Sequence, residues 1–241
     1  MRADALELRM RPRSPWEAVD LGIRFAQRHW REVHLCHVVV SVPVIALCIA
    51  SHELASWLPL ALLFLAKPWI DRASLFVLSR AAFGQRTSLG DLWRNQWRVL
   101  WRAFIPSITW RRLSPWRSFT QPIYQLEGSR VALRRRQLAS RHRGVALAMT
   151  SMFSLVETFL VIALVAGLAW FMPTERGSGD VMELVADFKS FAEVSLPALY
   201  GGVMLLLEPF YVAAGFAMYL NRRTELEAWD VEQELRHAFA S

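Results

Sequence analysis

Cysteine is scarce in this chain, and the signatures of common catalytic and metal sites are missing. The two cysteines, Cys36 and Cys48, lie on one expected helix about 18 Å apart, so they cannot pair with each other. The sequence has no glycine-rich phosphate loop, no H-E-x-x-H pair and no G-x-S-x-G turn. His34, Cys36 and His37 come closest to a metal cluster, but no fourth ligand is in reach along the sequence. We therefore expect no metal, no cofactor and no enzymatic activity.

A cleavable signal peptide is also missing. The first apolar block starts at Val33, behind a charged stretch without a small-residue cleavage site, so we expect this block to stay in the mature protein. With 54% hydrophobic residues and a net charge of +7, the chain is too apolar for a soluble domain of 241 residues. Its charges gather instead in the segments that connect the apolar blocks.

Four apolar blocks carry the fold prediction. They comprise residues 33–51, 54–70, 145–172 and 196–220. A hydrocarbon core about 30 Å thick needs roughly 20 helical residues, so the last two blocks are long enough to span it and the first two are marginal. Proline at position 68 should break or kink a helix. We predict an all-α, polytopic membrane protein with about four transmembrane helices and additional amphipathic interfacial helices.

The distribution of charge predicts the topology. Arginines crowd the first 32 residues and the middle of the chain, whereas the connection after residue 172 is acidic. The positive-inside rule then places the basic parts in the cytoplasm and the acidic part outside. The expected units begin with an amphipathic helix in 1–32 and a helical hairpin with a broken second arm in 33–83. An Arg/Trp-rich cytoplasmic elbow in 84–144 follows. Two transmembrane helices in 145–220 then enclose an acidic external loop, 173–195, and a cytoplasmic tail comprises 221–241. We expect a bacterial inner-membrane protein with both termini in the cytoplasm.

Two segments begin with the same helix-start pattern. Ser14 to Glu17 and Ser88 to Asp91 each place an acid three residues after a serine cap. In the first helix one apolar face is expected to lie in the membrane interface. Its members are Trp16, Val19, Ile23, Ala26 and Trp30.

The second helix alternates tryptophan and arginine stripes. The stripes consist of Trp93, Trp97 and Trp101 and of Arg94, Arg98 and Arg102. Such a helix suits anionic lipid headgroups, where indoles prefer the interface, and it also suits a docking surface for another protein. Nucleic-acid binding is not expected, because no recognised module is present and the positive-inside bias accounts for the excess charge.

Glu157 and Glu208 lie near the middle of the last two apolar blocks. A carboxylate at that depth is costly and should face the interior of the helix bundle. It could hold helices together, bind a ligand or lipid headgroup, or carry protons. The expected partners on the cytoplasmic side are Lys67, Asp71, Arg72 and Arg80, and Tyr211 completes the candidate site.

Several motifs together resemble known membrane proteins. They are the stretches 14–22, 67–72, 77–84, 113–119, 208–211 and 219–230. In these motifs the chain resembles an uncharacterised family of proteobacterial inner-membrane proteins and, more distantly, the membrane domain attached to some glycerophosphodiester phosphodiesterases. The resemblance implies a helical fold and a bacterial inner-membrane location. It implies no activity, since the catalytic domain of the second group has no counterpart here.

Two functional hypotheses follow. The first is a non-enzymatic scaffold or assembly subunit of an envelope complex, with the Arg/Trp helix as its docking face. The alternative is a small transporter or lipid-handling protein that uses Glu157 and Glu208. A copurifying soluble partner would favour the scaffold, and a cavity that touches both glutamates would favour the alternative.

Overall fold

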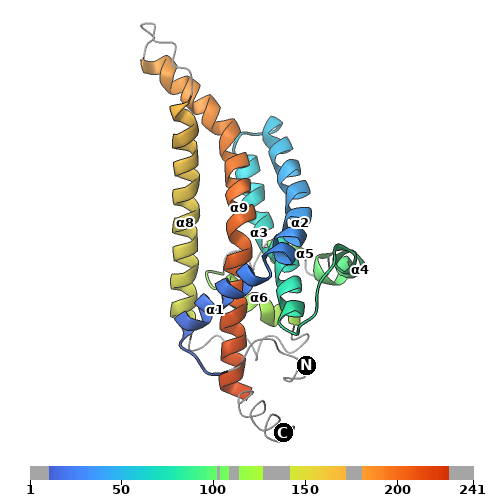
Figure 1. Cartoon of the computed structure of the whole chain (residues 1–241). Helices are drawn as coiled ribbons and strands as arrows, with labels where there is room; N and C mark the ends of the chain where they lie inside the picture. Colours follow the sequence, from blue (N-terminus) through green and yellow to red (C-terminus); the bar gives the residue numbers. More distant parts are fainter. Residues whose placement is uncertain (1–10, 102–103, 109–113, 127–141, 172–180, 228–241) are drawn as a thin grey trace, which may run out of the picture.

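The computed structural model describes residues 11–101, 104–108, 114–126, 142–171 and 181–227. All regular secondary structure in these residues is helical, which confirms the all-α prediction. The long helix α9 (Val181–Glu227) lies between α8 (Arg143–Trp170) on one side and the hairpin of α2 (Trp30–Ala50) and α3 (Leu58–Ala81) on the other (Figure 1).

Three of these helices are long and apolar enough to cross a membrane. The candidate spans are Trp30–Glu53, Arg143–Leu168 and Ser195–Glu227, which correspond to α2, α8 and part of α9. They coincide with the first, third and fourth apolar blocks, and the chain is therefore an all-α membrane protein. The second apolar block forms the first half of α3, which is not among the three candidate spans, so a fourth span stays a prediction.

Helix α3 differs from its prediction, because it runs without interruption through Pro68. Two glutamines one turn apart on α6 (Arg117–Leu126) support its backbone there. Gln121 donates to the carbonyl oxygen of Pro68 at 3.2 Å, and Gln125 donates to that of Arg72 at 3.1 Å. Pro68 itself deprives the carbonyl of Phe64, four residues earlier, of its helical donor. The glutamines instead join α6 to the backbone of α3 from the proline onward. The sequence showed the proline but not these partners.

The acidic loop predicted for 173–195 is also corrected in part. Helix α9 already begins at Val181, so residues 181–195 are helical, while 172–180 lie outside the described residues. Residues 181–195 contain neither glycine nor proline, the residues that most often end a helix. Acidic side chains mark the side of the membrane, but they do not interrupt a helix.

Helix α1 (Pro15–Arg28) begins with the expected capping box, in which Ser14 and Glu17 exchange hydrogen bonds of 3.3 Å. Two members of its predicted apolar face, Val19 and Ala26, are buried against the bundle. Trp16 is 46% exposed, whereas Ala18, Gly22 and Phe25 are buried. A β-carbon on Gly22 would lie 2.4 Å from the carbonyl oxygen of Ala213, so α1 packs directly on the backbone of α9. Close backbone approach at a glycine, and not the tryptophan face, sets the orientation of this helix.

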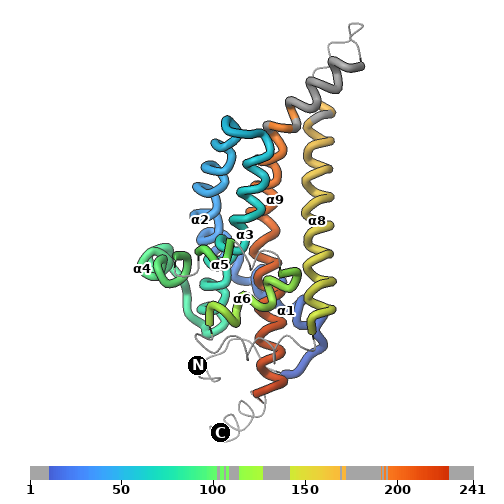
Figure 2. The backbone as a smooth tube through the Cα atoms, turned by 180° about the vertical axis from the view of Figure 1, so that it is seen from behind, coloured from blue at the N-terminus to red at the C-terminus, as the bar shows by residue number. Residues whose placement is uncertain are grey.

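The expected elbow is divided between the surface and the interior. Helix α4 (Leu89–Val99) lies beside α3 on the side away from α8, and the short α5 (Phe104–Ile108) follows it (Figure 2). Trp69 of α3 holds the end of α4 by donating to the carbonyl oxygen of Leu100 at 2.9 Å. Helix α6, by contrast, is buried from Arg117 to Ile123 and packs against α9, where Gly215 lies against Ser118. Part of the elbow is therefore core.

The α1–α9 contact yields a first prediction. Gly22→Ala should destabilise the protein by about 1–3 kcal/mol, because the added methyl group overpacks against the backbone of Ala213. The matched control is Gly202→Ala on α9, where a β-carbon meets nothing within 4 Å and helix propensity should improve. Thermal unfolding in detergent measures both variants, and equal melting temperatures would contradict the packing at Gly22.

Candidate functional site

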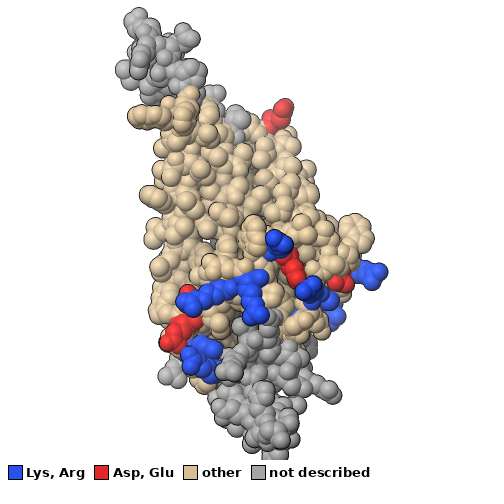
Figure 3. Space-filling view, viewed as in Figure 1, with Lys and Arg blue, Asp and Glu red and all other residues tan. Residues whose placement is uncertain are grey.

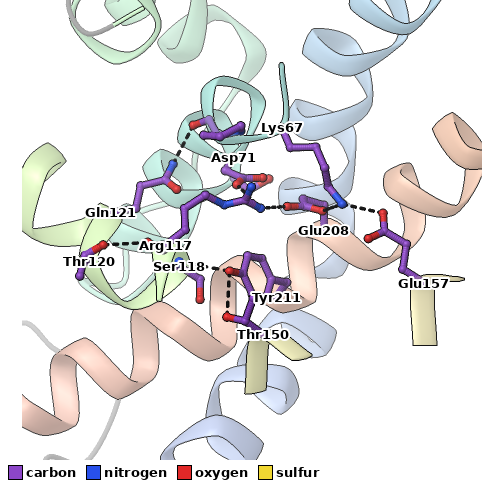
Figure 4. A network of polar contacts seen from close by, with 12 residues as sticks. Lys67, Asp71, Arg117, Ser118, Thr120, Gln121, Thr150, Glu157, Glu208 and Tyr211 are labelled. Atoms are coloured by element: carbon purple, nitrogen blue, oxygen red, sulfur yellow. Dashed lines mark hydrogen bonds and ion pairs between the residues drawn. The ribbon is translucent and has the colours of Figure 1, made fainter. Parts of the chain in front are cut away.

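A network of buried ion pairs joins four helices in the middle of the bundle (Figure 4). The ammonium group of Lys67 on α3 lies 2.5 Å from a carboxylate oxygen of Glu157 on α8 and 2.8 Å from one of Glu208 on α9. Lys67 and Glu208 are each 4% exposed. One lysine thus connects three helices that are distant in sequence.

Arg117 of α6 completes the network from the opposite side. Its Nη2 lies 2.5 Å from Oε1 of Glu208 and 3.2 Å from Oδ2 of Asp71 on α3, and Asp71 is fully buried. Burial by itself lowers the pKa of Arg117, but the carboxylates of Asp71 and Glu208, together with nearby tyrosines, outweigh it and raise the pKa above its usual value. Arg117 therefore remains charged, and Glu208 lies between two cations.

A hydroxyl group borders the network. The Tyr211 hydroxyl accepts a hydrogen bond from the backbone N–H of Ser118 at 3.4 Å and shares another with the Thr150 hydroxyl at 3.2 Å. The guanidinium group of Arg117 stands 5.1 Å from the centroid of the Tyr211 ring, within the range of a cation–π contact. These contacts orient Arg117 toward the carboxylates.

Most of the residues expected at this site come together, and two do not. Glu157, Glu208, Lys67 and Asp71 belong to the network, and Tyr211 borders it. Arg80 instead lies 3.8 Å from Asp91, and Arg72 donates to the carbonyl oxygen of Val99. Both side chains stabilise the α3–α4 region.

Sequence reasoning missed Arg117. It was one arginine among many in the elbow, and its distinguishing signal was weak. An uncharged stretch, residues 118–126, follows it directly, whereas most other arginines of the elbow have another charged residue within four positions. A lone arginine at the head of an apolar and amide-rich helix is a candidate for burial beside a carboxylate.

A cavity of about 180 Å³ opens beside the network, among α3, α8, α9 and the start of α6. Both glutamates line it, together with Lys67, Arg117 and Tyr211. Its remaining lining residues are Phe64, Ser114, Pro115, Thr150, Phe153, Ser154 and Leu207. A cavity needs about 10–15 Å³ to hold one water, so this one has room for a chemical group of several heavy atoms. Its wall combines charged and hydroxyl groups with aromatic rings.

The histidines near the start of α2 have structural surroundings. His37 is fully buried, and its Nδ1 lies 2.8 Å from the Ser74 hydroxyl of α3. His34 lies beside the ring of Phe210, with a centroid separation of 5.3 Å. Within the described residues, no group of three or more histidine, cysteine or acidic side chains is placed to hold a metal ion.

The Arg/Trp stripes of α4 lie on the surface. Trp93 and Trp97 are 72% and 75% exposed, and Arg94 and Arg98 are exposed beside them. Trp101 packs an edge against the ring of Trp69, whereas Arg102 lies outside the described residues. A second capping box starts the helix, and its hydrogen bonds from Ser88 lower the pKa of Asp91. This surface is separate from the cavity.

The charge balance of the network yields a second prediction. Lys67→Met leaves three carboxylates with one arginine and should destabilise the protein by on the order of 3 kcal/mol. Glu208→Gln leaves two cations with two carboxylates, each cation still paired, and should cost clearly less. Thermal unfolding of both variants in the same detergent measures the difference. A loss from Glu208→Gln as large as that from Lys67→Met would show that pairing distances, and not the charge balance, decide stability.

Comparisons with known proteins give no further assignment. No protein-family model matches the chain, and neither a curated protein nor a solved structure matches it. The resemblance to proteobacterial inner-membrane proteins stays a prediction. The cavity and the exposed helix α4 are therefore the two features of the described chain that bear on function.

Proposed function

We propose that this chain is a non-enzymatic, lipid-handling membrane protein that binds an amphipathic ligand in the cavity beside the ion-pair network. The observation that carries the proposal is that one cavity touches both Glu157 and Glu208. Ion pairs hold most of the charged atoms of the wall in place, so a ligand meets a site that is already formed.

The rim of the cavity supports entry from the bilayer. Phe64 and Ser154, which line the cavity, are exposed on α3 and α8. Most of the outward surface of α8 is apolar and exposed, with Leu155 and Phe159 at 70% and 72%. Only 6% of its membrane-span window is buried in the bundle, as expected for a helix that faces lipid. A ligand with a polar end and an apolar end matches a polar cavity that opens on an apolar surface.

The distribution of charge supports the proposed orientation in a bacterial inner membrane, with both termini in the cytoplasm. On the face seen in Figure 3, the described lysines and arginines lie in the lower half, near α1 and α4, and the coloured part of the upper half is almost free of charge. The two ends of the described chain meet at that lower end, where Asn221 exchanges two hydrogen bonds of 2.9 Å with the backbone of Arg13. The basic end corresponds to the cytoplasmic side under the positive-inside rule.

Blocking the cavity tests the proposal. We expect the wild-type protein, purified in mild detergent, to retain bound lipid in native mass spectrometry. Ser154→Trp should reduce the retained lipid at least fivefold, because the indole fills the mouth of the cavity. The control is Ser151→Trp, an exposed position of α8 that does not line the cavity. Equal lipid retention by the two variants would contradict binding in this cavity.

A second candidate function, a scaffold for an envelope complex, is favoured by α4. Its two most exposed indoles and the adjacent arginines form a surface that no described part of the chain covers. A protein partner that docks on α4 would bury this surface. If α4 instead contacts anionic lipid headgroups, no protein partner is expected there.

Replacing both arginines of α4 tests the scaffold. Arg94→Gln combined with Arg98→Gln should weaken capture of a specific partner from native membranes, at roughly 1 kcal/mol per arginine. Helix content should remain, since glutamine is nearly as good a helix former as arginine. Pull-down with mass spectrometry compares the double variant with the wild type. Unchanged recovery of every copurifying protein would leave α4 as a contact for lipid headgroups.

A further inference from the structure

The ion-pair network contains one more carboxylate than it contains cations. Lys67 and Arg117 are its two cations, and Asp71, Glu157 and Glu208 are its three carboxylates. An uncompensated charge is expensive inside an apolar bundle, whereas a paired charge is tolerated. Burial raises the pKa of Asp71, which is fully buried, well above its usual value and so favours its neutral form. The charged carboxylates of the network are then Glu208, which lies between two cations, and Glu157.

The carboxylate of the network that a ligand can reach is Glu157. Asp71 is fully buried, and the side chain of Glu208 is 5% exposed between two cations. Glu157 stands at the open end of the network, where its side chain is 15% exposed and lines the cavity. Its Oε1 accepts from Lys67, and its Oε2 accepts no hydrogen bond from the described residues. This oxygen is available to a donor inside the cavity.

We propose that the cavity selects an amphiphile bearing a primary ammonium group, and that Glu157 is the residue that recognises this group. The inference rests on the proposed function and adds the chemical class of the ligand. A primary ammonium group donates hydrogen bonds to a carboxylate at short, charge-assisted distances, which a quaternary trimethylammonium group, having no N–H, cannot do. Aromatic rings of the wall, among them Phe64 and Phe153, add cation–π attraction and accommodate the apolar part of the ligand.

The negative charge of Glu157 should make the cavity prefer cationic amphiphiles to anionic ones. A carboxylate-bearing or otherwise anionic amphiphile would place a second negative charge beside Glu157. Neutral amphiphiles would fill the cavity without forming a charge-assisted hydrogen bond to Glu157. Both should bind more weakly than an amine with the same chain length.

Binding of simple amphiphiles to the full chain tests the inference. The protein, purified in a neutral detergent, is titrated at pH 7 with dodecylamine, dodecyltrimethylammonium, dodecanol and dodecanoate, with thermal shift and intrinsic fluorescence as readouts. We expect dodecylamine to bind at least tenfold more tightly than each of the others. Glu157→Gln should reduce this affinity at least tenfold and remove the preference for amine over alcohol.

Two controls separate recognition from folding. Glu157→Gln leaves both Lys67 and Arg117 paired with Glu208, so its melting temperature without ligand should stay close to that of the wild type. Glu53→Gln, at the exposed corner between α2 and α3, removes a carboxylate that does not line the cavity and should keep the wild-type affinity.

Lipid nanodiscs identify the source of the amine. Retention of phosphatidylethanolamine over phosphatidylcholine, lost in Glu157→Gln, would support a lipid headgroup as the ligand. Binding of dodecylamine without retention of phosphatidylethanolamine would support a smaller amphiphilic amine. Equal affinity for dodecanoate and dodecylamine, or unchanged affinity in Glu157→Gln, would overturn the inference while leaving lipid binding intact. Failure of every amphiphile and lipid to bind would overturn the proposed function itself.

Discussion

The structure depends on the requirement that charges inside an apolar helix bundle be paired. Lys67 and Arg117 reach Glu208 from opposite sides, and they bring α3 and α6 to α9, while Lys67 also reaches α8. Desolvation makes each of these charges costly alone, so the helices that carry them can pack only in arrangements where the charges meet. The network thus selects one relative placement of four helices, which apolar packing alone would leave less specific.

Helix α9 is the element against which most of the bundle packs, and its small residues allow close approach. Helix α1 contacts its backbone at Ala213 through Gly22, and α6 approaches Gly215 through Ser118. Such contacts between small residues are common among membrane helices, where van der Waals packing replaces the hydrophobic driving force that lipid does not supply. The two approaches lie within one turn of each other on α9. They position α6, and therefore Arg117, beside the carboxylates.

The cavity and α4 belong to different parts of the molecule and support different proposals. The cavity opens between α3 and α8, with polar groups inside and apolar helices around it, as suits a ligand taken from the bilayer. Helix α4 lies on the side of the bundle away from α8 (Figure 1). Its indoles and guanidinium groups are exposed. Lipid handling in the cavity is compatible with a docking role for α4, because the two surfaces share no residue.

Local signals in the sequence determined the helical class, three apolar helices and both capping boxes, because hydropathy and helix starts depend on neighbouring residues. They also singled out Glu157, Glu208 and Lys67, since a charge inside an apolar block must find a partner. Tertiary structure alone decided the rest. The hydrogen bond from Gln121 to the backbone of α3 at Pro68 depends on how α6 folds back into the bundle, and so does the choice of Arg117 over Arg80. These outcomes are set by contacts between residues some 50 to 90 positions apart, which no local pattern records.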